Sequence, residues 1–119
     1  MKVLLGKIIN SKEVLIKIGN SSAYDAVTAY TVARNISLLN IELETFDKSR
    51  IELIKKYGEE QDDGNTSVLK DKIPEYNREL SELLNLEIEI NITMINPEKL
   101  TGLTPFDMMA IDWMLELNE

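Results

Sequence analysis

The chain has 119 residues, 44% of them hydrophobic, and contains neither cysteine nor histidine. This length suits one domain with a modest core. The missing residue types exclude disulfides, thiolate nucleophiles, histidine general bases and most zinc sites. Any catalysis would therefore have to use carboxylates, Lys, Tyr or Arg.

Charge is unevenly distributed along the chain. Residues 1–58 carry nine Lys and Arg against six Asp and Glu (net +3), and residues 59–119 carry four against fifteen (net −11), which gives −8 in total. Such asymmetry can steer partners or favour head-to-tail association. An acidic chain is a poor nucleic-acid binder, because phosphate contacts need clustered Lys and Arg.

No apolar run approaches the roughly 20 residues that span a bilayer. Lysines also interrupt the N-terminal apolar segment, which therefore does not read as a signal peptide. From these two features we expect a cytoplasmic protein that makes no membrane contact.

The N-terminal region predicts a strand followed by a short helix. Branched aliphatic residues favour an edge strand within Lys2–Ile9. Ser11 is a suitable N-cap for a helix over Lys12–Ile18, which would end at Gly19.

The segment from Ser22 to Tyr57 contains no Pro or Gly and predicts one long helix over residues 22–57. Ser21 or Ser22 would cap its start, and Gly58 would end it. Apolar residues recur on one stripe at steps of three and four, which is typical of a helix that packs along a partner. At 1.5 Å per residue the helix would be roughly 54 Å long, more than the width of a compact domain of this size. We therefore expect the protein to form a homo-oligomer, with an interface at Val32, Ile36, Leu39, Leu43 and Phe46.

The second half of the sequence predicts shorter elements. An acidic turn at 59–65 is followed by a helix over 74–84, with Pro74 in its first turn, which would lie antiparallel along the long helix. Residues 86–94 alternate Leu or Ile with polar residues, the pattern of a half-buried strand that would pair with the N-terminal strand or with the segment near Ser67. Thr104 and Pro105 begin a C-terminal helix over 105–117. The expected fold is α+β and mostly helical, a single domain with one long amphipathic helix, two or three shorter helices and a small antiparallel sheet.

This order of segments resembles a group of small uncharacterised proteins encoded by phages and prophages of Gram-positive bacteria. The resemblance covers roughly residues 30–117. It rests on Ile51–Gly58, the acidic Gly-Asn turn, Tyr76–Leu84 with its YNREL and ELL, the alternating Glu/Ile strand, and Leu103–Pro105 before a Met-rich helix. It implies a phage accessory or morphogenesis protein in a bacterial cell, and it assigns no catalytic residue.

Arg50 occupies a position of the long helix where the repeat calls for an apolar residue. One interpretation is an ion pair with Glu79 or Glu82 of the second helix, or a side chain that reaches solvent. The other is an anion site, because a guanidinium binds phosphate or carboxylate through two parallel hydrogen bonds. In that case the ligand-binding residues would be Arg50, Arg34, Asn35 and Tyr30, contributed by two chains and suited to a nucleotide.

The C-terminal helix predicts a contact surface for a partner protein. Met repacks readily, and Trp is a common anchor at interfaces. The candidate residues are Met108, Met109, Trp113 and Met114, although Met109 and Trp113 would equally complete the core.

Acidic residues elsewhere offer weaker candidates. The turn at Asp62–Asn65 lacks the ligand spacing of an EF-hand, so we expect no metal site. Glu87 and Glu89 lie two apart on one strand face and could act together in acid–base chemistry or hold a cation, but the pattern favours the solvated side of an amphipathic strand.

The sequence therefore predicts a protein without enzymatic activity or cofactor that acts by binding. One hypothesis is a phage-encoded antagonist of a bacterial defence, which binds a host protein through its acidic half or sequesters a nucleotide signal at a helix interface. The alternative is a virion-assembly or tail-associated factor that holds a structural partner through the Met/Trp helix.

Overall fold

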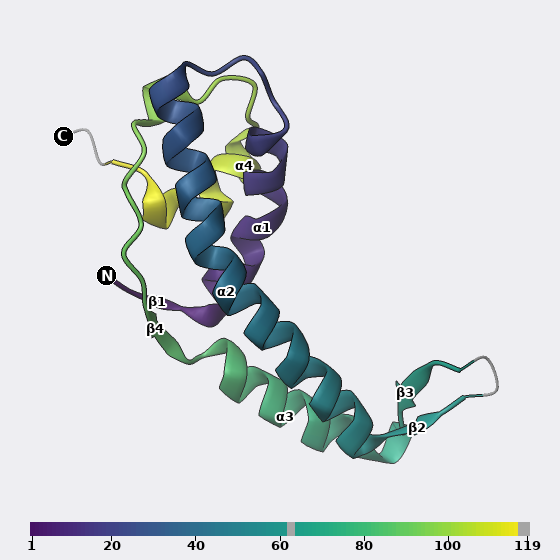
Figure 1. Cartoon of the computed structure of the whole chain (residues 1–119). Helices are drawn as coiled ribbons and strands as arrows, with labels where there is room; N and C mark the ends of the chain where they lie inside the picture. The colour runs from purple at the N-terminus through teal and green to yellow at the C-terminus, as the bar shows by residue number, and fades with distance from the viewer. Residues whose placement is uncertain (62–63, 117–119) are drawn as a thin grey trace.

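The molecule consists of a packed lobe and a thinner arm, joined by one helix that runs through both (Figure 1). The computed structural model describes residues 1–61 and 64–116. Its dimensions are 49 × 29 × 24 Å and its radius of gyration is 17.2 Å, against roughly 13.5 Å for a compact chain of this length. The lobe comprises residues 1–39 and 90–116. The arm comprises residues 40–86.

Helix α2 (Ala26–Tyr57) is the shared element. It starts four residues later than predicted, because the Asp25 carboxylate accepts a hydrogen bond from the Thr28 N–H at 2.8 Å and so caps the helix in place of the serines. It ends before Gly58, as predicted. A Cβ at Gly58 would lie 2.3 Å from the Ile54 carbonyl oxygen, so only glycine fits where the chain leaves α2.

The N-terminal prediction is wrong in its boundaries. Strand β1 (Lys2–Leu4) is short, and helix α1 (Leu5–Gly19) starts directly after it. Ser11 is therefore not a cap. It lies buried in the middle of α1, with its hydroxyl 2.8 Å from the Lys7 carbonyl oxygen. Helix α1 forms because its apolar residues recur at helical spacing and face α2, which outweighs their strand propensity.

Two separate pairs of antiparallel strands are present. Strand β1 pairs with β4 (Glu87–Glu89), which confirms one of the two predicted pairings. Strands β2 (Gly58–Glu60) and β3 (Thr66–Val68) form a hairpin at the tip of the arm. Within the predicted turn, positions 62 and 63 lie outside the described residues, and Gly64 has a positive φ of 85°.

Helix α3 (Ile73–Leu84) confirms the prediction at 74–84 and returns along the C-terminal half of α2 (Figure 1). The 3₁₀ turn η1 (Lys70–Lys72) precedes it. The strand predicted at 86–94 is formed only at 87–89. Beyond it the chain is extended but is held by a side chain of α2, described below.

The predicted helix over 105–117 is wrong in length, and residue 117 lies outside the described residues. Helix α4 (Pro105–Ala110) begins with a capping box between Thr104 and Asp107 and is followed by the 3₁₀ turn η3 (Asp112–Met114). Beyond η3 the chain is extended and pairs with Ile95, which donates its N–H to the Met114 carbonyl at 2.8 Å and accepts from the Glu116 N–H at 2.8 Å. The 3₁₀ turn η2 (Pro97–Lys99) lies between Ile95 and α4.

The hydrophobic core lies entirely in the lobe. Its fully buried residues come from α1, the first half of α2 and residues 90–115, and include Ile8, Val32, Leu39, Ile111 and Met114. No described residue from 40 to 89 is buried. The fold is α+β and mostly helical, as the sequence predicted.

Candidate functional site

The four residues predicted to bind a ligand do not lie together in one chain. Tyr30 is 69% exposed, and Arg34 is also exposed on the first half of α2. Arg50 follows Arg34 by 16 residues, which is about 24 Å along a helix. These side chains therefore do not line one pocket within the described part of the chain.

Asn35 has a structural position and is not available to a ligand. It is completely buried, and its side-chain amide donates to the Thr93 carbonyl and accepts from the Thr93 N–H, both at 2.9 Å. The Asn35 side chain thus provides hydrogen-bond partners for the N–H and carbonyl of Thr93, in the place that a neighbouring β-strand would otherwise take. The prediction of a binding role for Asn35 is wrong because the side chain fixes residues 91–96 to α2.

Arg50 does not pair with α3. Its Nε lies 3.9 Å from Asp47 Oδ1, one turn earlier on the same helix, and its side chain is 42% exposed. Glu79, one of the two expected partners, binds Lys56 instead. Arg50 thus reaches solvent along the edge of the arm, as the snorkelling interpretation expects.

The residues predicted as an oligomer interface divide between lobe and arm. Val32 and Leu39 are each 1% exposed and are covered by the lobe of their own chain. They offer no surface to a second copy, so their assignment to an interface is wrong. Ile36, Leu43 and Phe46 are half-buried.

The predicted Met/Trp surface is also divided. Met114 is completely buried, and half-buried Trp113 donates its indole N–H to the Ser11 hydroxyl at 2.8 Å. Both residues belong to the lobe core, so their assignment to partner contact is wrong. Met108 packs against that core, whereas Met109 is 66% exposed.

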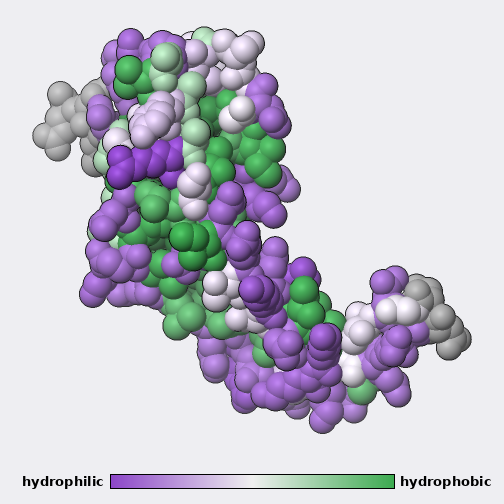
Figure 2. Space-filling model, viewed as in Figure 1, coloured by the Kyte–Doolittle hydropathy of each residue, from purple (hydrophilic) through white to green (hydrophobic). Residues whose placement is uncertain are grey.

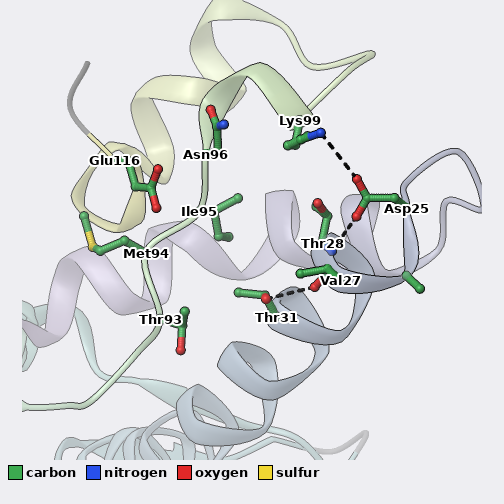
Figure 3. A pocket seen from close by; sticks show the side chains of 11 residues that line it. Asp25, Val27, Thr28, Thr31, Thr93, Met94, Ile95, Asn96, Lys99 and Glu116 are labelled. Atoms are coloured by element: carbon green, nitrogen blue, oxygen red, sulfur yellow. Dashed lines mark hydrogen bonds and ion pairs between the residues drawn. The ribbon is translucent and has the colours of Figure 1, made fainter. Parts of the chain in front are cut away.

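The hollows on the described part of the surface include a lobe cleft and an arm groove. The lobe cleft, of about 510 Å³, lies between the start of α2 and residues 93–99 (Figure 3). The arm groove, of about 570 Å³, lies between α2 and α3.

The polar groups of the lobe cleft are used by the fold. Asp25 caps α2 and lies 3.9 Å from Lys99, while the Thr31 hydroxyl donates to the Val27 carbonyl at 2.9 Å (Figure 3). Asn96 accepts from the Glu98 N–H at 3.0 Å. The pKa of Asp25 is lowered, first by the hydrogen bonds from Thr28. These contacts hold backbone ends in place, and they leave the cleft few free groups to bind a ligand.

The arm groove combines apolar side chains with carboxylates. Its lining residues are Ser49, Glu52, Leu53 and Lys56 of α2, Glu79, Glu82 and Leu83 of α3, and Leu86 just beyond α3. Leu86 is 49% exposed. Figure 2 shows the surface over α3 as largely hydrophilic, with small hydrophobic areas between it and α2.

One end of the arm groove is closed by an ion pair between the two helices. Lys56 Nζ lies 3.2 Å from Glu79 Oε2 and 5.1 Å from the centre of the Tyr57 ring. Hydrogen bonds from Tyr57 and Lys56 lower the pKa of Glu79, and the bond to Glu79 raises the pKa of Lys56. Glu52 and Glu82 have no ion-pair partner among the described residues. The groove therefore presents two uncompensated carboxylates beside a leucine floor.

Comparison with known proteins identifies no relative. The sequence matches no family model, and neither the curated proteins nor the solved structures give a match. Within the described ranges, no group of three or more acidic side chains is arranged to hold a metal ion. No described helix has both the length and the apolar character needed to cross a membrane.

The arm groove was missed by reasoning from sequence, although its residues carried a signal. The helix predicted at 74–84 does lie along α2, but the sequence pattern places Leu86 on the buried face of a strand. Glu79 and Glu82 were considered only as partners for Arg50. On both helices the lining residues follow a three-and-four spacing, which would have located a shared face once the antiparallel pairing was assumed.

Proposed function

We propose that the protein acts by binding another protein through its arm and catalyses no reaction. The observation that carries this proposal is the difference in burial: the lobe holds the whole core, while the arm keeps apolar residues in two helices without burying any described one. A two-helix layer can cover only one side of each apolar stripe, and exposed apolar surface rimmed by polar groups is typical of interaction sites.

The positions of the acidic residues support a binding role over carboxylate catalysis. Glu89 receives an ion pair from the N-terminal ammonium at 2.9 Å, and Glu87 is exposed on the same strand. Acid–base catalysis by two carboxylates needs one of them shielded from water. In the described part of the chain these two side chains stand in solvent, and the Glu89 ion pair joins β4 to the N-terminus.

The resemblance to phage and prophage proteins makes a host protein the expected partner, in the bacterial cytoplasm. Interference with a bacterial defence would follow from occupying a functional surface of that host protein. The acidic half of the sequence, residues 59–119, contains α3 and the arm tip, so the charge asymmetry favours a partner with a basic surface.

The two other hypotheses receive less support. A nucleotide bound by Tyr30, Arg34 and Arg50 would need copies of the chain to bring distant side chains together. An assembly factor that binds through the C-terminal helix retains only Met109 of its predicted residues as a largely exposed side chain, beside Phe106 at 81% exposure.

Site-specific photo-crosslinking in bacterial cells tests the proposed function. A photoreactive residue is placed singly at Ser49 or Asn77 of the arm and at Asn10 or Ser37 of the lobe. All four positions lie outside the core. We expect one host protein to be captured from the arm positions, and to bind the purified chain in a one-to-one complex.

Capture of the same protein from the lobe positions alone would place the binding surface elsewhere and contradict the proposal. Capture from no position, in the host that carries the gene, would also contradict it.

A further inference from the structure

We infer that the arm groove holds an amphipathic helical segment of the partner that carries Lys or Arg beside its apolar residues. This inference rests on the proposed function and names the chemistry of its partner. The groove lies between two antiparallel helices, and no third helix of the described part of the chain contributes a lining residue. A third helix would pack its own apolar stripe against both, which is the common way for helical layers to complete a core.

The shape of the groove fits a helix. The lining residues run from Ser49 to Lys56 on α2, and from Glu79 on α3 to Leu86 just beyond it, a span of seven residue steps on each side. Seven residues correspond to about 10.5 Å, or two helical turns. An incoming helix of two to four turns would therefore cover the leucine floor along its full length.

The charge of the groove selects a basic helix. Glu52 on α2 and Glu82 on α3 both line the groove with its leucines, and neither forms an ion pair with a described cation. Lys or Arg residues flanking an apolar stripe would reach both carboxylates while their stems add apolar contact.

The same charges argue against a second copy of this chain as the occupant. Two copies that meet groove to groove would bring the carboxylates of Glu52 and Glu82 together and repel each other. A bound anion would meet the same repulsion. A small polycation would satisfy the carboxylates but would leave the leucines uncovered.

Calorimetry with a designed peptide tests the inference. The probe is a 14-residue peptide of Leu and Lys in a helical pattern, titrated into the full chain at physiological salt. Its controls are a scrambled peptide of the same composition and spermine. We expect the patterned peptide to bind at least about tenfold more tightly than either control, because only it presents apolar and charged faces together.

Charge reversal at the groove gives the matched comparison. The double variant Glu52→Lys with Glu82→Lys changes the charge at the groove, and Glu13→Lys with Glu98→Lys makes the same change in net charge at exposed lobe positions. We expect the groove variant to lose about tenfold or more in affinity and the lobe variant to change less than threefold. Circular dichroism verifies that both variants remain helical. Leu86→Ala should weaken binding of the peptide, although it changes no charge.

Equal weakening by both double variants would mean that net charge attracts the peptide, and would overturn the inference. Equal binding of the scrambled peptide or spermine, or no binding by the wild type, would overturn it as well. The two proposals are tested independently. If the groove does not bind the peptide but crosslinking captures a host protein from the arm, the further inference is overturned and the proposed function is kept.

Discussion

The two halves of α2 carry one apolar stripe, interrupted at Arg50, but have different surroundings. In the lobe, Val32 and Leu39 are 1% exposed because α1 and the 90–116 segment cover them. In the arm, Phe46 and Leu53 of the same stripe stay half-exposed, since α3 is the main element packed beside them. An apolar stripe therefore specifies a helix and its inward face. How deeply its side chains are buried depends on how many other elements pack against that face. The lobe thus supplies most of the buried apolar surface, and the arm keeps apolar side chains that remain partly exposed.

The largest expected effect is the difference in stability between truncating a leucine of the lobe and truncating a leucine of the arm. Leu39→Ala removes a fully buried side chain from the lobe and should lower the free energy of unfolding by about 2–5 kcal/mol. Leu83→Ala removes a half-buried side chain from the arm and should cost only about 1 kcal/mol. Urea denaturation of both variants checks this. Equal losses would show that the arm contributes to stability as much as the lobe does.

The next effect concerns the polar bond that closes the lobe. Asn35→Ala leaves the Thr93 N–H and carbonyl without this partner and should cost about 1–3 kcal/mol in total, because water can reach the exposed Thr93. Asn40→Ala, at an exposed position of the same helix, is the control and should change stability by less than about 0.5 kcal/mol. Denaturation midpoints measure both. If the two variants were equally stable, water would have to replace the Asn35 side chain at Thr93.

The smallest effect is a pH dependence that belongs to the lobe. The ammonium of Lys17, 2.6 Å from Asp107, and the Thr104 N–H lower the pKa of Asp107 in the folded state. A carboxyl with a lowered folded pKa stabilises the protein above its unfolded pKa of about 3.9 and loses this contribution as pH falls through the folded value. Asp107→Asn should therefore lower the denaturation midpoint at pH 7 and have a smaller effect near pH 2.5.

Exposed Asp112→Asn is the matched control for this pH dependence and should show no such trend. A loss at Asp107→Asn that is the same at both pH values would mean that the capping geometry matters and the charge does not. The arm carries a similar ion pair at Lys56 and Glu79, so the same measurement on Glu79→Gln would show whether the arm also loosens in acid.

The sequence by itself determined the parts that depend on neighbours in the chain. The long helix ending at Gly58, the helix at 73–84 and the capped start at Thr104 all follow from local spacing, capping and turn chemistry. The mostly helical α+β class followed from the same signals. These features are local because a helix or a cap is formed by residues within four positions of each other.

The tertiary structure alone decided which apolar residues are buried and which polar ones are free. Asn35 holds the backbone of the extended segment because residue 93 lies beside it in space, and the Ser11 hydroxyl is buried because Trp113 and Ala110 reach it from the other end of the chain. The arm groove likewise needs two helices that are 23 residues apart at their nearest lining positions, 56 and 79. Contacts of this kind join residues far apart in sequence, and the local spacing of apolar residues does not specify which distant segment will pack against them.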